Sequence, residues 1–159
     1  MPDVLRIQDQ CYTDIVPESA QSLRAKVEAS PATCLVAETE GAVLGYLIAV
    51  PVAFPDLPAL DAPGCALPAA PDTLYLHDLA VARAGRGTGA GQRLVRSVLE
   101  AANAAGFERA CLVAIQGSVP YWQQFGFVPE APPHAGIAAK LASYGPSAQL
   151  MAARLRPPA

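Results

Sequence analysis

Four glycines alternate along one short stretch of the chain, and this stretch constrains the fold more than any other. They are Gly85, Gly87, Gly89 and Gly91. The residues just before them, 74–81, are mostly apolar and predict a buried strand. The residues after them repeat apolar side chains at helical spacing from Ala90 to Ala102. The sequence therefore predicts a strand, a glycine-rich loop and a helix in succession.

The charge of this stretch points to a bound anion. Residues 83–96 hold four of the eleven Lys and Arg residues and no acidic residue, although the whole chain carries a net charge of −3. Backbone N–H groups and the positive end of a helix dipole favour phosphate at such a place. Glycines also form tight turns that bind nothing, but such a turn has no need of arginines. We expect a compact polyanion here rather than a nucleic acid.

Two common phosphate-binding motifs fit this loop poorly. A P-loop requires a Lys after its second glycine, and no Lys follows these glycines. The dinucleotide fingerprint requires Gly-x-Gly-x-x-Gly, and the frame that starts at Gly85 ends on Ala90, which is a permitted variant. The dinucleotide motif is therefore a weak alternative that stays open.

A third motif fits more closely. Arg86–Gly91 resembles the Arg/Gln-x-x-Gly-x-Gly/Ala signature of the GCN5-related N-acetyltransferases, the GNAT superfamily. Downstream, Tyr121–Phe127 resembles the aromatic-x-x-x-Gly-Phe segment of the same family. About 35 residues separate the two motifs, which leaves room for one helix and one strand. The resemblance is close over Leu74–Pro129 and looser elsewhere.

The resemblance implies an α/β (α+β) fold with a mixed, mostly antiparallel twisted sheet flanked by helices. By its length, the chain is expected to form a single acetyltransferase domain over residues 1–159. The family usually begins with a strand, but here a helical pattern starts at Pro2. Either the first strand is missing, or the start codon lies upstream of Met1.

The remaining elements follow from periodicity and turn signals. A second helix is expected from about Pro17 to Ser30, a strand hairpin over 33–52, a strand over 109–115, a short helix over 118–125, a strand starting at Phe127 and a last strand over 147–155. Residues 129–142 are Pro-rich and expected to be irregular, apart from a short helical turn. The loop 53–72 contains five prolines, and we expect it to form one wall of an acceptor site, opposite the turn near Tyr12 and Pro17.

The resemblance also implies a function: transfer of an acetyl group from acetyl-CoA to a primary amine of a small molecule, a peptide or a protein. The cofactor pyrophosphate would then lie on the loop amides, and the end of the preceding strand would pair with the pantetheine arm. The cofactor-binding residues implied in this way are Leu79, Ala80, Val81, Arg86, Gly87, Thr88, Gly89, Ala90 and Gly91.

Acetylation requires a group that takes a proton from the acceptor. His77 and Asp78 are the two titratable residues of the buried strand, and either is a candidate for this base. Both are equally consistent with polar core residues that are satisfied by local hydrogen bonds. Because adjacent strand residues point to opposite faces, only one of them is expected to face a given cleft.

The leaving thiolate needs a proton in return. In the family a Tyr commonly stands four residues before the Gly-Phe pair, but this chain has Trp122 there. An indole N–H can form a hydrogen bond to the cofactor but does not give up its proton near neutral pH. Three alternatives remain: Tyr144 donates the proton, a water donates it, or the thiolate leaves unassisted. Of these we favour Tyr144 over water.

The composition bears on three other classes of protein: metal-binding, nucleic-acid-binding and membrane proteins. The four cysteines lie far apart and there are only two histidines, so we expect no metal site. Acidic balance disfavours nucleic acid, and no apolar run is long enough for a membrane helix. We expect a cytoplasmic monomer or homodimer, with no signal sequence. The main alternative function is a non-catalytic acyl-CoA-binding or regulatory module, because such a module would keep the glycine loop.

Overall fold

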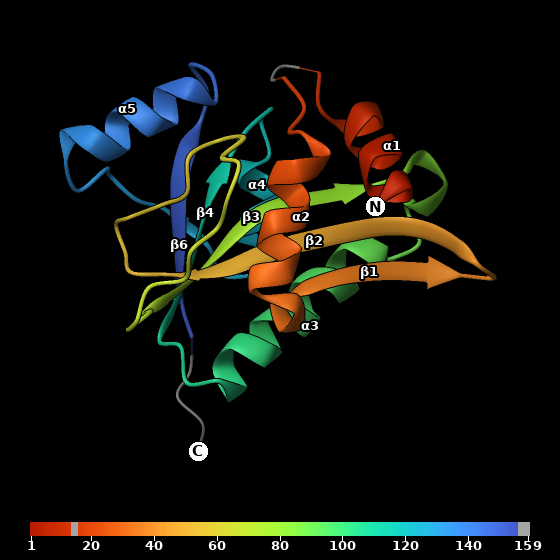
Figure 1. Ribbon diagram of the computed structural model, residues 1–159, viewed down its shortest axis with the longest axis horizontal. Helices are drawn as coiled ribbons and strands as arrows, with labels where there is room; N and C mark the ends of the chain where they lie inside the picture. Colours follow the sequence, from red (N-terminus) through yellow and green to blue (C-terminus); the bar gives the residue numbers. More distant parts are fainter. Residues whose placement is uncertain (14–15, 156–159) are drawn as a thin grey trace.

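A six-stranded sheet runs through the molecule in the order β1-β2-β3-β4-β6-β5 (Figure 1). The computed structural model describes residues 1–13 and 16–155. The strands are β1 (Cys34–Thr39), β2 (Ala42–Val52), β3 (Thr73–Val81), β4 (Arg109–Ala114), β5 (Val128–Pro129) and β6 (Gln149–Arg154). Only β3 and β4 run parallel; the other neighbouring pairs are antiparallel. The predicted mixed, mostly antiparallel sheet is therefore confirmed.

Helices cover both faces of this sheet (Figure 1). They are α1 (Pro2–Cys11), α2 (Ala20–Ala29), α3 (Ala90–Ala104), α4 (Val119–Gln123) and α5 (Ala135–Ser143). Along β2, Leu47 and Ala49 pack in one apolar cluster with α3, whereas Tyr46 and Ile48 pack in another with α1 and α2. Alternating side chains of a strand point to opposite faces, so α3 lies on one face and α1 and α2 lie on the other. Within the described residues no strand precedes α1.

The prediction of an irregular segment over 129–142 is wrong, because α5 occupies much of it. The His134 side chain begins this helix: its Nδ1 accepts hydrogen bonds from the N–H groups of Gly136 (3.0 Å) and Ile137 (3.3 Å). Histidine is not among the common N-cap residues, so the sequence offered no usual start signal. Ile137 is buried against the loop residue Leu57, and this contact stabilises the helix.

The pairing of β2 with β3 contains a bulge that shapes the centre of the sheet. Ala49 lies opposite Leu76 and Ile48 lies opposite Asp78, which leaves His77 as an extra residue in β3. An extra residue of this kind resets the alternation of side chains along the strand. Side chains before and after the bulge can therefore point to the same face.

The pairing of β3 with β4 is short. It joins Thr73–Leu76 to Arg109–Leu112 and then stops, although β3 continues to Val81. Beyond Leu76 the two parallel strands separate. This separation leaves an opening in the middle of the sheet, at the carboxyl ends of both strands.

A buried ion pair ties α2 to the sheet. Ser22 and Lys26 are four residues apart, which places them on one side of α2, and both contact Glu18 just before the helix. Lys26 is fully buried, and its Nζ lies 3.2 Å from Glu18 Oε2 and 2.9 Å from Ser22 Oγ. The second oxygen of Glu18, Oε1, is hydrogen-bonded to Nε2 of His77 on β3. One carboxylate thus joins the helix to the strand.

These contacts set the acidity of Glu18. Burial alone raises its pKa, but the hydrogen bond and charge of His77, with Lys26 and Ser22, outweigh burial and lower the pKa from 4.5 to about 2. The unfolded chain therefore takes up a proton at this carboxyl at higher pH than the folded protein does. The charge of Glu18 favours folding above about pH 4.5, and this contribution is lost as the pH falls toward 2.

We expect the stability of the protein to depend less on acid pH when both members of the Glu18–Lys26 ion pair are replaced. In the double variant Glu18→Gln/Lys26→Met, the free energy of unfolding should fall less steeply between pH 4.5 and 2 than in the wild type, because the depressed pKa is gone. Urea unfolding at a series of pH values measures both slopes. Equal slopes would mean that Glu18 does not carry this linkage.

Candidate functional site

A cleft of about 430 Å³ lies where β3 and β4 separate. Its lining comes from α1, the segment before α2, the loop 53–72, both strands, the glycine-rich loop and α4. It reaches from Arg86 in the glycine-rich loop to Tyr144, the residue after α5. The lining of the cleft therefore combines the basic side chain of Arg86 with hydroxyl groups such as that of Tyr144.

The glycine-rich loop leaves the N-terminus of α3 open for a ligand. Gly89 is the N-cap residue with φ +84°, a left-handed conformation that favours glycine, and it has no side chain with which to cap the helix. Thr88 holds the loop: its hydroxyl donates to Gly85 O (2.5 Å) and accepts from Ala90 N–H (3.3 Å). A side chain at Gly91 would lie 2.7 Å from Tyr121 Oη. Bare amides at a helix N-terminus beside Arg86 suit a phosphate group.

The end of β3 offers its backbone to the same cleft, which Leu79, Ala80 and Val81 all line. Ala82 N–H donates to Leu44 O of β2, and successive peptide groups of a strand alternate sides. The backbone groups of Leu79 and Val81 therefore face away from β2, into the opening. Their carbonyl groups already accept from Tyr12 Oη (2.8 Å) and Cys11 Sγ (3.3 Å) of the α1 segment, which leaves their N–H groups for a ligand.

The structure corrects the expectation that only one of His77 and Asp78 can face a cleft, because both line it. The reason is the bulge at His77. Asp78 lies opposite Ile48, on the face covered by α1 and α2, and His77 contacts Glu18 on that same face. The alternation rule fails where the strand gains an extra residue.

Asp78 is held by two tyrosines. Its Oδ1 accepts from Tyr12 Oη at 2.5 Å, and its Oδ2 accepts from Tyr46 Oη at 2.7 Å. Burial raises the pKa of Asp78, against the hydrogen bonds and the nearby His77, which lower it. Burial also raises the pKa of both tyrosines, and the Asp78 charge adds to this shift. Both carboxylate oxygens are thus engaged within the protein.

His77 has one engaged nitrogen and one without a partner. Nε2 bonds to Glu18, whereas Nδ1 is buried and has no hydrogen-bond partner among the residues that the structure describes. The side chain is only 1% exposed, and its ring packs edge-on against Tyr75 with centroids 5.6 Å apart. A buried polar atom without a partner is uncommon in a native fold.

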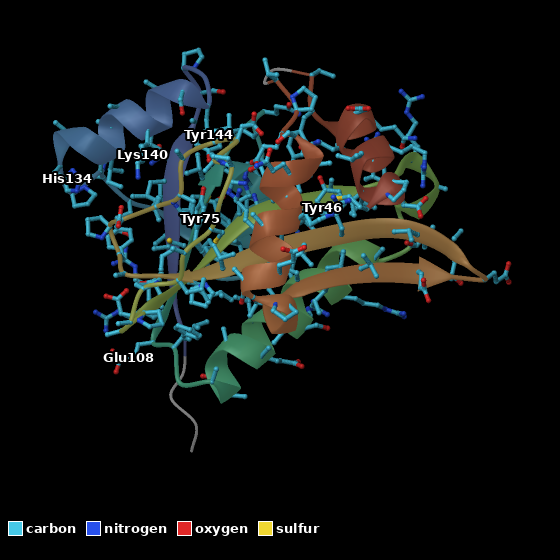
Figure 2. The ribbon with its side chains drawn as sticks, in the orientation of Figure 1. Tyr46, Tyr75, Glu108, His134, Lys140 and Tyr144 are labelled. Atoms are coloured by element: carbon cyan, nitrogen blue, oxygen red, sulfur yellow. The ribbon has the colours of Figure 1, made fainter. Side chains whose placement is uncertain are left out.

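Tyr144 lines the cleft, and its hydroxyl oxygen lies 3.4 Å from that of Tyr75 (both residues are labelled in Figure 2). Burial raises the pKa of Tyr144 to about 12, so its hydroxyl keeps its proton at neutral pH. Trp122 also lines the cleft and packs against Phe127 with ring centroids 5.8 Å apart. The structure thus brings together Tyr144, Trp122 and His77, the predicted site residues farthest apart in sequence.

The loop 53–72 contributes Leu60 to the cleft, and so does Tyr12 from the end of α1. The loop is fastened at two points. Ser19 N–H donates to Asp61 Oδ1 at 2.8 Å, and Lys140 Nζ of α5 donates to Leu57 O. This placement supports the expected wall, while Pro17, predicted to stand opposite, does not line the cleft.

Sequence reasoning missed several residues that shape the site. Glu18 enters the prediction only within the expected second helix, and Lys26, Tyr46 and Tyr75 are not singled out there. One signal was present: a serine and a lysine stand four residues apart on a helix that also carries the apolar Leu23, and a glutamate stands four residues before the serine. Charges on the buried side of a helix are rare unless they are paired. The two buried tyrosines offered no such signal, since their hydroxyl partners lie far away in sequence.

Two further observations concern the described part of the chain. Residues 1–13 and 16–155 contain no group of three or more His, Cys, Asp or Glu side chains placed to hold a metal ion. No helix in these ranges is long and apolar enough to cross a membrane.

Comparison with solved structures finds the same fold. A GNAT-like decarboxylase, GphF, in complex with isobutyryl-CoA superposes with a TM-score of 0.75 at 19% identity, covering 98% of this chain and 94% of that one. Ard1 from Thermoplasma volcanium gives 0.69 at 17% identity, covering 98% and 90%. N-acetylglutamate synthase from Neisseria gonorrhoeae, complexed with coenzyme A and N-acetyl-glutamate, gives 0.71 at 15% identity, covering 98% of this chain but only 33% of that one. At these identities the likeness establishes the fold alone.

Comparison of sequences establishes the family. No curated protein matches the chain significantly. A model of the acetyltransferase (GNAT) family matches residues 1–127, which include the glycine-rich loop, both separating strands and the aromatic segment of α4. The family supports acyl-CoA-dependent acyl transfer as the general activity. This chain belongs to the acetyltransferase (GNAT) family.

Proposed function

We propose that the protein is an acetyl-CoA-dependent N-acetyltransferase that acetylates a primary amine. The observation that carries this proposal is one cleft whose lining includes Arg86, beside the open N-terminus of α3, as well as His77 and Tyr144. A module that only binds acyl-CoA would need the first of these features and not the other two. The acceptor is a small-molecule, peptide or protein amine.

The cofactor would occupy the opening from the glycine-rich loop inward. Its pyrophosphate would lie on the amides of residues 86–91, with Arg86 adding positive charge. The pantetheine arm would pair with the backbone of Leu79–Val81, where the N–H groups of Leu79 and Val81 face the opening. Trp122 would pack beside the arm from α4.

In the reaction, the amine nitrogen attacks the thioester carbonyl, a C–N bond forms and the C–S bond breaks. His77 is placed to receive the proton that the amine loses, directly or through a water. Asp78 is a weaker candidate, because two tyrosine hydroxyls already occupy its oxygens. Tyr144 is placed to protonate the leaving thiolate, since its own hydroxyl stays protonated at neutral pH.

Thiol release tests the proposal. We expect acetyl-CoA incubated with the protein and a panel of amines to release free CoA thiol, and mass spectrometry to find the matching acetylamide. The panel should include aliphatic amines, amino acids and peptides with free N-termini. Binding of acetyl-CoA without release in the presence of any amine would favour the non-catalytic module instead.

The glycine-rich loop should tolerate loss of its charge better than loss of its shape. We expect Gly89→Val to abolish measurable acetyl-CoA binding, because a β-branched residue at φ +84° distorts the N-cap and blocks approach to the amides. Arg86→Ala should weaken binding by about tenfold or less, because the amides remain. Isothermal calorimetry measures both. Unchanged affinity in Gly89→Val would place the cofactor elsewhere.

The proton donor can be tested by removing one oxygen atom. We expect Tyr144→Phe to lower kcat by about 10² or more while acetyl-CoA affinity stays within about twofold. Steady-state kinetics from pH 6 to 9 measures the effect, with Tyr75→Phe as the matched variant that removes the neighbouring hydroxyl. Wild-type turnover in Tyr144→Phe would leave a water, or no donor, as the source of the proton.

A further inference from the structure

We propose that Glu18 and Lys26 are positioning residues that hold His77 in one tautomer, with its proton on Nε2, so that Nδ1 is the nitrogen that takes the acceptor's proton. The inference rests on the proposed function for the chemical role of Nδ1. The positioning itself follows from the contacts of three buried side chains.

The tautomer follows from what each atom can donate. Glu18 is ionised at neutral pH, since its pKa is held at about 2, and an ionised carboxylate only accepts hydrogen bonds. Its Oε1 lies in hydrogen-bond contact with His77 Nε2, so Nε2 must carry the proton of that bond. In the neutral ring the other nitrogen, Nδ1, then bears a lone pair.

Lys26 fixes Glu18 in the orientation that this bond requires. Its ammonium donates to Glu18 Oε2 at 3.2 Å and to Ser22 Oγ at 2.9 Å, and the Ser22 hydroxyl donates to the same Oε2 at 2.8 Å. With Oε2 held from the α2 side, Oε1 is turned toward β3. The Lys26 side chain is 1% exposed and that of Glu18 5%, so solvent does not compete for these contacts.

The free nitrogen has no structural partner. Nδ1 of His77 is buried and makes no hydrogen bond within the described residues, although the residue lines the cleft. With Nε2 taken by Glu18, only Nδ1 is left to meet a ligand or a bound water. An accepting nitrogen left unpaired in this way costs stability, which the arriving amine or water would recover.

Other titratable groups also surround the ring. Asp78 follows it on β3 and is bonded to Tyr12 of the α1 segment and Tyr46 of β2. Tyr75 contacts the ring, and Tyr144, after α5, bonds Tyr75. None of these donates to or accepts from either imidazole nitrogen. Glu18 alone sets the tautomer.

The proton balance is complete without a further reactant. A neutral amine attacks the thioester, and the nitrogen of the tetrahedral intermediate gives one proton to Nδ1. The C–S bond then breaks, and the thiolate takes a proton from Tyr144 or from water. The imidazolium returns its proton to solvent or to the donor, so amine and acetyl-CoA give the acetylamide and the free thiol.

Nuclear magnetic resonance of the imidazole nitrogens tests the tautomer without any acceptor. The chain has only two histidines, and the variant His134→Gln assigns the second. We expect wild-type His77 at pH 7.5 to carry a single proton, on Nε2, and the double variant Glu18→Gln/Lys26→Met to give a mixture of tautomers. A wild-type ring protonated on Nδ1, alone or with Nε2, would overturn the inference.

Kinetics test the consequence. We expect the double variant to keep its acetyl-CoA affinity within about twofold while kcat falls at least about tenfold, because the base is no longer held in one form. The matched control is Glu28→Gln, which removes an exposed carboxylate from the same helix and should leave kcat unchanged.

The outcomes separate the two proposals. Wild-type turnover with an unchanged tautomer in the double variant would overturn the positioning role and leave the proposed function intact. Absence of turnover with every amine would overturn the proposed function and the proton-accepting role together. In that case the protonation pattern of the ring still decides whether Glu18 and Lys26 set the tautomer.

Discussion

The early end of the pairing between β3 and β4 is the constraint on which the site depends. Four residue pairs hold the strands together, from Thr73 with Arg109 to Leu76 with Leu112, and beyond them the backbone of β3 is unpaired on that side. Unpaired peptide groups inside a protein need other partners. Tyr12 and Cys11 supply some of them, and the remaining N–H groups open into the cleft. The same break also makes room for side chains from α4 and from the segment after α5.

Buried polar residues lie near the place where β3 and β4 separate, and they form two hydrogen-bonded groups. Tyr12, Tyr46 and Asp78 form one set, and Glu18, Lys26 and His77 form another. Buried carboxylates are tolerated only when their oxygens are satisfied, and each set satisfies its own. The two sets differ in whether every polar atom has a hydrogen-bond partner. Both oxygens of Asp78 have partners, whereas the imidazole of His77 keeps one nitrogen free.

The sequence predicted local elements better than distant contacts. The strand, glycine-rich loop and helix around Gly89 were predicted from alternating glycines and apolar spacing. Both signals are local, because they depend on the order of residues within one segment of the chain. The helix α5 was missed because a histidine side chain caps it. That both His77 and Asp78 line one cleft was missed because the bulge depends on the register with β2, which a single sequence does not contain. The spacing of Glu18 and Lys26 in the sequence hinted at their ion pair. The hydrogen bond from Glu18 to His77 could not be predicted in this way, because the two residues are 59 positions apart.

The contact between α5 and the loop 53–72 has a consequence for how such a site can change. Lys140 bonds the Leu57 carbonyl, and Ile137 packs on the Leu57 side chain, so helix and loop behave as one mechanical unit. Leu60 lies on this unit, and Tyr144 follows its helix directly. A substitution that shifts the loop therefore also shifts Tyr144 in the lining of the cleft. The shape of this wall of the cleft and the position of Tyr144 are thus coupled through the contacts of α5 with Leu57.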